Sequence, residues 1–362
     1  MLYKENWDEA KEMFKAYFQQ QNEKRPLVTL TATKGKKVGS QVFAGVVPGT
    51  SHEDHWLYAQ NIIDRNVNYF ENTYFAAESI PYININLGPG VTAAYLGCPA
   101  KLMDFTVWFD HIINDWGKDS FDFDEQNFWW KKTKELTEAA CIAGKGKFLT
   151  GITDLSGVLD IMAHMRGTQE FIYDLVDEPE LVMEASAKIQ RLWFKYFDEL
   201  CNITRNYQEG TIDWLSVWSP GTSHTLQCDF AAMLSPNQVE EYYLPELQDQ
   251  CKRLDNSIFH LDGPDCVKHL DLLLEVPELN AIQWQPGAGQ PPAVEWMDVL
   301  KKIQYKGKSI VMDAELKSVE YILENLSPKG LFINTYDRFD SPQEAEDYIK
   351  YIEKLCVNKY NK

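Results

Sequence analysis

The chain has 362 residues, of which 44% are hydrophobic and 25% are charged, a composition typical of a globular protein with a substantial core. Its formal net charge of −19 disfavours nucleic acid and anionic membrane surfaces as partners, because both would be repelled. No run of 18 uncharged apolar residues occurs, and the N-terminal segment lacks the apolar stretch of a secretory signal, so neither a membrane span nor secretion is expected. Seven scattered cysteines favour a reducing, cytoplasmic location over a disulfide framework.

The first 26 residues have the charged, amphipathic pattern of a helix. Short β-type runs then recur, each followed by turn residues and a helix-like stretch. These runs lie at 27–32, 81–88, 147–154, 213–218, 257–262, 280–285, 308–313 and 331–336. Eight strands alternating with helices, without an interrupting linker, predict an α/β fold, a single (β/α)8 TIM barrel over residues 1–362 with an N-terminal helical extension at 1–26. A doubly wound sheet is the second choice, because no glycine-rich phosphate fingerprint follows the first strand.

Polar and aromatic residues gather where the predicted strands end. They are Asn86, Asp154, Trp218, His260, Asp262, Trp284, Gln285, Asp313, Tyr336 and Asp337. Any one of them could be a turn residue or a helix cap. In a barrel, however, the carboxyl ends of all strands converge on the face that carries the chemistry. The sequence therefore predicts a substrate pocket at that face.

The segment 259–263, Phe-His-Leu-Asp-Gly, places two reactive side chains at one strand end. His260 and Asp262 are two residues apart, so in a strand they lie on the same side. Such a pair can bind a metal ion or transfer protons, and two ligands alone do not define a zinc site. Cys266 and His269 follow in a helix-like stretch with the pattern of a packed helix. We therefore regard His260 and Asp262 as the candidate catalytic pair and leave both chemistries open.

The segment 213–245 is expected to end a strand at Trp218 and continue in a loop rich in polar groups. His224, Cys228 and Asp229 lie in that loop, before Ser235 and Pro236 begin a helix. Loops on a barrel face commonly carry binding residues, so His224 and Asp229 are predicted to contact substrate. A nucleophile–base pair of Cys228 and His224 is the alternative, although their spacing matches no known signature.

Several segments in this order resemble the uroporphyrinogen decarboxylase superfamily, which also contains corrinoid-linked methyltransferases of the methylcobalamin:coenzyme M type. The segments are 87–97 (LGPGVTAAYLG), 153–167 (TDLSGVLDIMAHMRG), 228–236 (CDFAAMLSP), 259–263 (FHLDG) and 330–335 (GLFINT). The resemblance covers most of the chain from about residue 80 onward. It implies the same (β/α)8 barrel that the strand pattern predicts.

Two departures from the family patterns bear on the activity. Decarboxylases carry an arginine-rich segment after the first strand, and the corresponding residues 27–41 contain no arginine, so decarboxylation of a carboxylate-rich tetrapyrrole is disfavoured. The zinc-dependent methyltransferases use a His-x-Cys pair and a later Cys. The matching positions here are His260, Asp262 and Asp337, so both thiolates are replaced by carboxylates, which shifts the preference towards harder metals.

The resemblance implies a methyltransferase or demethylase that acts on a small substrate with a corrinoid protein as partner. Zinc or a harder divalent metal would be held by His260, Asp262 and Asp337. The predicted substrate contacts are Asp154, Trp218, His224, Asp229, Trp284, Gln285 and Tyr336. Three alternatives stay open: a decarboxylase, a metal-free site in which His260 and Asp262 form an acid/base pair, and a non-catalytic ligand-binding barrel. A homodimer is also left open.

Overall fold

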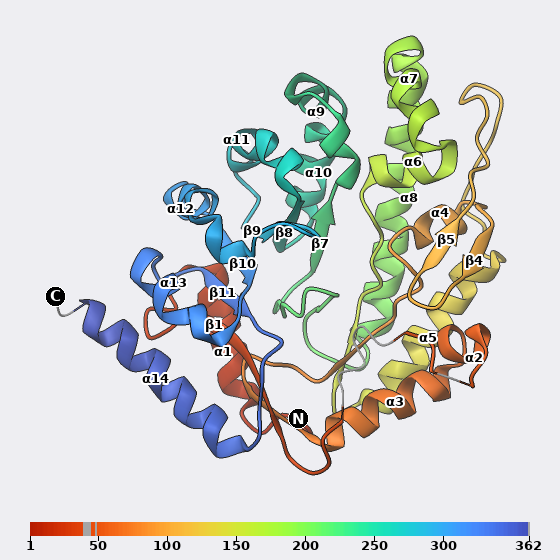
Figure 1. Ribbon diagram of the computed structural model, residues 1–362. Helices are drawn as coiled ribbons and strands as arrows, with labels where there is room; N and C mark the ends of the chain where they lie inside the picture. The colour runs from red at the N-terminus through yellow and green to blue at the C-terminus, as the bar shows by residue number, and fades with distance from the viewer. Residues whose placement is uncertain (39–44, 48, 361–362) are drawn as a thin grey trace.

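The computed structural model describes residues 1–38, 45–47 and 49–360. The end of the arginine-free segment 27–41 lies outside the described residues. The fold is mixed α/β, with a large, mainly parallel sheet and many helices (Figure 1). In the described part of the chain, no helix is long and apolar enough to cross a membrane.

The main sheet runs in the order β12-β1-β11-β10-β9-β8-β7, with β2 antiparallel to β1. All other neighbours in it are parallel. Its strands are β1 (Leu27–Thr33), β2 (Thr73–Ala77), β7 (Ser223–Gln227), β8 (Asn256–Asp262), β9 (Ala281–Gln285), β10 (Ser309–Asp313), β11 (Leu331–Asn334) and β12 (Arg338–Phe339). Two pairs stand apart: the parallel β3 (Tyr82–Asn84) with β6 (Leu149–Gly151), and the hairpin β4 (Ala100–Leu102) with β5 (Val107–Phe109). Seven of the eight predicted strand runs overlap an observed strand.

The predicted strand at 213–218 is wrong, and the strand in this part of the chain is β7. The side chain of Asp213 accepts a hydrogen bond from the backbone N–H of Leu215 at 3.1 Å, which is a turn rather than an extended segment. Ser216 then adopts a left-handed conformation with φ of 63°. An isolated bridge between Thr211 and Ser219 closes the loop. His224 consequently lies in a strand and not in a loop.

The expected closed barrel is not present as a continuous hydrogen-bonded sheet in the described residues, because β3 and β6 pair only with each other. The parallel strands nevertheless follow one another around an interior. Helices α9 (Pro236–Tyr242), α10 (Leu244–Arg253), α11 (Leu270–Leu274), α12 (Met297–Tyr305) and α13 (Val319–Asn325) flank the outer side of β7 to β11 (Figure 1). The other helices are α1 (Trp7–Phe18), α2 (His52–Trp56), α3 (Ala59–Glu71), α4 (Val91–Tyr95), α5 (Phe128–Gly144), α6 (Val158–Arg166), α7 (Thr168–Asp177), α8 (Pro179–Thr204) and α14 (Pro342–Tyr360).

Alternating strand residues divide the core into two clusters. The outward residues pack on the helices in one large cluster, which includes Phe259, Leu261 and Trp284. The inward residues form a second cluster with members from the main sheet and from the β3–β6 pair. These members are Leu27, Tyr82, Leu149, Ile258, Ala281, Val311 and Phe332. Two side chains of α1, Phe14 and Tyr17, belong to this second cluster. The helix α1 (Trp7–Phe18) lies within the segment 1–26, and it covers the interior at the end opposite the strand C-termini.

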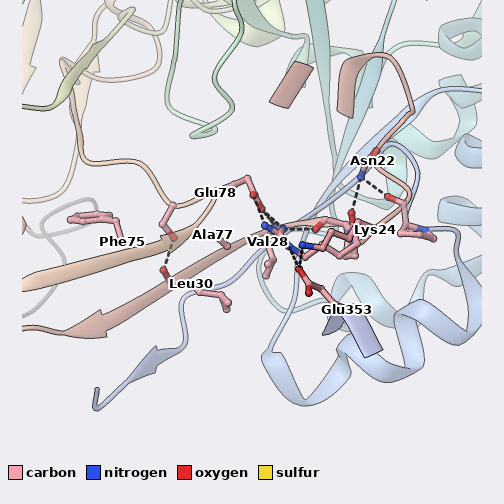
Figure 2. Close-up of polar contacts among 12 residues, drawn as sticks. Asn22, Lys24, Val28, Leu30, Phe75, Ala77, Glu78 and Glu353 are labelled. Carbon is pink, nitrogen blue, oxygen red and sulfur yellow. Dashed lines mark hydrogen bonds and ion pairs between the residues drawn. The ribbon is translucent and has the colours of Figure 1, made fainter. Parts of the chain in front are cut away.

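A buried ion pair fixes the start of β1 against the end of β2. The guanidinium of Arg25 donates to both carboxylate oxygens of Glu78, at 2.6 and 2.8 Å, and the N–H of Val28 donates to the same carboxylate at 2.9 Å. The polar contacts around Glu78 and Val28 are drawn in Figure 2. Arg25 and Glu78 are 3% and 1% exposed, so this pair is shielded from solvent. Such a bidentate geometry is what a buried charge pair needs to offset its desolvation.

Candidate functional site

The interior changes from apolar to polar along the strands. In six strands, the inward apolar residue of the second cluster is followed, two positions later in the chain, by an inward polar residue. These polar residues are Thr29, Asn84, His260, Gln283, Asp313 and Asn334. Because side chains two apart in a strand face the same side, these residues share the interior with the apolar layer beneath them. Five of these six strands, all except β3, belong to the main sheet and run parallel, so their polar positions converge at one end. That end is the candidate site.

His260 is held in one orientation by its neighbours. Its Nδ1 is hydrogen-bonded to Oε1 of Gln283, its partner on the adjacent strand, and Gln283 is only 3% exposed. An amide oxygen can only accept, so Nδ1 carries the proton and Nε2 is left with a free lone pair. The indole of Trp214 packs edge-on against the imidazole with ring centroids 5.1 Å apart. His260 is therefore positioned as a ligand or a base through Nε2.

Asp229, His260 and Asp262 form a group whose ligand atoms all lie within 4.8 Å of one another. Asp229 begins the 3-10 helix η1 (Asp229–Met233) directly after β7, and its backbone N–H donates to Asp160 at 3.1 Å. Burial raises the pKa of the Asp229 carboxyl, nearby His260 lowers it, and Asp262 raises it. Asp229 is nonetheless exposed, as expected at the mouth of a cavity.

The donor set of this group fits a divalent metal ion. Within the described residues, neither the Asp229 nor the Asp262 carboxylate has a hydrogen-bond partner or a pairing lysine or arginine. Two carboxylate oxygens and one imidazole nitrogen suit zinc and the harder first-row ions. Ligand atoms around a tetrahedral zinc ion lie about 3.4 Å apart, so small side-chain rotations would close the group.

Further aspartates surround the group. Burial and, to a smaller extent, the charges of Asp213, Asp229 and Asp160 raise the pKa of Asp154 to about 8, while the N–H of Ser156 lowers it. Burial also raises the pKa of Asp160 to about 7, with Asp229 adding to the shift. Among the described residues, no lysine or arginine forms an ion pair with any of these carboxylates. The site is therefore rich in carboxyl groups, and burial favours the protonated forms of Asp154 and Asp160 near neutral pH.

A pocket of about 270 Å³ opens beside this group, at the C-terminal ends of β9, β10 and β11. Its walls include Gln285, Asp313, Tyr336 and Asp337. It also borders Asp262, because a Cβ added to Gly287 in the pocket wall would lie 3.8 Å from the Asp262 Oδ1. The volume is at the small end for ligand pockets, which usually measure about 300–1,000 Å³. The site therefore suits a small substrate.

A hydrogen-bond network fixes Asp313 in the pocket wall. The amide of Asn334 donates to its Oδ1 at 2.9 Å, and the hydroxyl of Tyr336 donates to its Oδ2 at 3.3 Å. Thr29 in turn donates to the Asn334 Oδ1 at 2.8 Å. Burial raises the pKa of Asp313, while these hydrogen bonds and His260 lower it. Asp313 thus connects the pocket with the His260 group.

The structure brings together a large part of the predicted site. His260, Asp262 and Asp229 form the ligand group, and Gln285, Tyr336 and Asp337 line the pocket. Asp154 lies near Asp229, since the two carboxylates affect each other. Asp337, predicted as the third metal ligand, is not part of the ligand group found in the described residues. One of its oxygens accepts the backbone N–H of Leu316 at 2.7 Å.

Three predicted pocket residues lie in the core instead. Trp218 is 1% exposed, packs on Trp7 and donates to the Glu209 carbonyl at 3.0 Å. Trp284 is fully buried on the helix-facing side, with its ring 5.2 Å from that of Trp296. His224 is fully buried between aromatic rings of α8, and burial lowers its pKa to about 3. None of the three reaches the pocket.

Two residues that contact His260 directly, Gln283 and Trp214, were not predicted as site residues from the sequence. Gln283 could have been identified, because it lies two residues before Gln285 and so shares its side of the strand. Trp214 could not, because its placement depends on the turn at Asp213 and on the bridge between Thr211 and Ser219.

No protein-family model matches the chain, and no curated protein matches its sequence. Among solved structures, the chain resembles a methyltransferase from Methanosarcina mazei, with a TM-score of 0.59 over 95% of this chain and 98% of that one. The two sequences are only 10% identical. At that identity the likeness shows the fold alone: the chain has the α/β architecture of that methyltransferase over nearly its whole length.

Proposed function

We propose that the chain is a methyltransferase or demethylase that acts on a small substrate and holds a divalent metal ion with Asp229, His260 and Asp262. The observation that carries this proposal is the group of three ligand atoms within 4.8 Å beside a small pocket. The likeness to a methyltransferase fold and the sequence resemblance to corrinoid-linked methyltransferases support it. As part of the proposal, the chain works as one barrel domain whose strand ends carry the site.

The sequence suggested His260, Asp262 and Asp337 as metal ligands. The proposed set keeps His260 and Asp262 and has Asp229 in place of Asp337. When bound, the ion would supply Lewis acidity that lowers the pKa of a coordinated thiol or water. Carboxylate ligands shift the preference from zinc towards harder ions such as manganese, while the imidazole of His260 still suits zinc or iron. Because Nδ1 of His260 is bonded to Gln283, Nε2 is the ring nitrogen that would bind the ion.

The remaining residues would position the substrate and control its charge. Asp313 and Tyr336 hold one wall of the pocket in place through their hydrogen bond. Without an ion, His260 through Nε2 would act as a base towards the substrate, with Asp262 stabilising the protonated imidazole. The pocket is small for a tetrapyrrole, and its acidic lining would repel carboxylates, so both features oppose the decarboxylase alternative. A corrinoid would be brought by a partner protein, as the sequence resemblance implies.

Elemental analysis of variants tests the ligand set. The wild-type protein should bind about one equivalent of zinc or manganese after dialysis, whereas His260→Ala and Asp229→Asn should each lose it. Asp337→Asn is the matched control and should keep its metal, because Asp337 lies outside the group. Loss of metal from Asp337→Asn with retention in Asp229→Asn would overturn the proposed set in favour of His260, Asp262 and Asp337.

The methyl-transfer part needs a separate assay. Methylcobalamin mixed with the protein and small thiols or amines should lose its methyl group, which is followed by the change in the corrinoid absorption spectrum. His260→Ala should reduce the rate by about 100-fold or more, because it removes the central ligand or base. An unchanged spectrum with every acceptor, together with no methylation of the reduced corrinoid by small methylated donors, in the presence of bound metal, would refute methyl transfer.

A further inference from the structure

The pocket wall combines negative charge with apolar surface. Three of its lining residues carry carboxylates, Asp313, Glu315 and Asp337, and no lining residue is a lysine, arginine or histidine. Glu315 is paired with Lys317 at the rim, whereas neither Asp313 nor Asp337 is paired with a cation in the part of the chain that the structure describes. The interior of the pocket therefore presents uncompensated negative charge to a ligand.

The rest of the wall offers groups that contact alkyl substituents. Pro286, Pro291, Pro292, Ala293 and Ala314 line the pocket and can donate no hydrogen bond from their side chains. Tyr336 lies in the same wall, with its hydroxyl held on Asp313 at 3.3 Å. An aromatic ring beside carboxylates attracts a positive charge that carries methyl groups.

A further polar side chain lies next to His260. Gln227, at the end of β7, is the strand partner of His260 and shares its inward side. Its backbone carbonyl accepts the hydroxyl of Tyr243 at 3.1 Å, and the residue is 5% exposed. The side-chain amide of Gln227 therefore adds a hydrogen-bonding group on the side of the sheet that carries His260.

We propose that this pocket binds a small organic cation whose charged centre carries methyl groups, a methylated ammonium or sulfonium compound, as the methyl donor. This inference rests on the proposed function. In the transfer, the bond between the methyl carbon and nitrogen or sulfur breaks, its electron pair stays on the heteroatom, and the methyl group passes to a nucleophile, the reduced corrinoid of the proposed reaction. A sulfonium donor leaves as a neutral thioether, which the acidic wall holds less tightly than the substrate, whereas an ammonium donor leaves as an amine that takes up a proton from solvent.

A pair of isosteric probes tests the charge requirement directly. Choline and 3,3-dimethyl-1-butanol have nearly the same shape and differ in a charged nitrogen against a neutral carbon. Isothermal titration of the metal-free protein, without corrinoid, should give choline at least about tenfold higher affinity than the alcohol.

Variants assign the preference to the pocket. Asp313→Asn should reduce choline affinity about five- to tenfold and leave the alcohol unchanged, because the substitution keeps the shape and removes the charge. Asp64→Asn, on the exposed face of α3, is the charge-matched control and should change neither affinity. Asp337→Asn is a second pocket variant in case Asp313→Asn does not fold, as checked by circular dichroism.

The outcomes separate this inference from the proposed function. Equal binding of the two probes, or an unchanged preference in both pocket variants, would overturn the cation assignment even if methyl transfer from another donor is observed. Selective choline binding that Asp313→Asn abolishes supports the assignment even if no methyl group is transferred. Selective choline binding without methyl transfer would therefore contradict only the proposed reaction.

Discussion

Replacement of Asp154 by asparagine should make the protein more stable at neutral and alkaline pH. Burial is the main reason that the pKa of Asp154 is raised from 3.8 to about 8. The folded state therefore holds a proton that the unfolded state releases between about pH 4 and pH 8. By linkage, the wild-type free energy of unfolding falls as the pH rises through that window. Asparagine keeps the oxygen that accepts the Ser156 N–H at 2.8 Å and removes the titration.

The size of the effect follows from the shift. A change from 3.8 to about 8 is about 4 pH units, or about 6 kcal/mol at 1.36 kcal/mol per unit. Asp154 is only partly buried, so solvent screens its carboxylate, and neighbouring carboxylates share the protons; we therefore expect about 2 kcal/mol. Urea unfolding followed by circular dichroism at several pH values between 4 and 9 measures it. The Asp154→Asn protein should equal the wild type at pH 4 and exceed it by about 2 kcal/mol at pH 8.

Asp64→Asn, on the exposed surface of α3, controls for the loss of one negative charge from a protein of net charge −19. It should shift the free energy of unfolding by less than about 0.5 kcal/mol at every pH. A difference between Asp154→Asn and the wild type that is constant from pH 4 to pH 9 would refute the reasoning, because a constant difference reflects packing and not proton linkage.

Three further predictions use the same unfolding and metal assays. Glu78→Gln should lower the free energy of unfolding by about 3 kcal/mol, because it removes the bidentate partner of a buried guanidinium and leaves only Glu353 at 3.9 Å, whereas Glu275→Gln at an exposed ion pair should cost less than about 1 kcal/mol. Gln283→Leu should lower zinc affinity about 10- to 100-fold in a competition titration, because the Nδ1–H of His260 loses its acceptor; unchanged affinity would contradict the proposed orientation. His224→Phe should lower stability by about 1–3 kcal/mol but leave metal binding unchanged, since this histidine lies in the core, and loss of metal would place it in the site.

The sequence was sufficient for the strands and for the centre of the site because both depend on local patterns. His260 and Asp262 are two residues apart in a strand that is strongly apolar before them, and period-two alternation alone puts them on one side. The strand end also identified Gln285 and Tyr336, which line the pocket. These residues follow from spacing along one strand.

The errors arise where tertiary structure decides. Buried parallel strands are apolar on both faces, so the sequence does not indicate which face of β9 is inside. Trp284 was therefore assigned to the pocket, although its register with Leu261 places it among the helices. The segment 213–218 has strand-forming residues, but the Asp213 turn and the conformation of Ser216 override that preference. Asp229 joined the ligand group only because β7 and β8 are neighbours, a pairing that no spacing encodes.

The distribution of charge links the metal and the organic cation. A divalent ion at Asp229 and Asp262 would neutralise these two carboxylates and leave Asp313 and Asp337 to balance a ligand in the pocket. Two thiolates in place of those aspartates would also neutralise the ion, but their softer donors would activate a thiol more strongly. Compared with thiolates, carboxylate ligands donate less electron density to the ion. The ion is then a stronger Lewis acid, and a thiol bound to it is a weaker nucleophile. In this site the substrate's own positive charge would therefore activate the methyl group, and the protein would chiefly supply the negative surroundings that bind the cation.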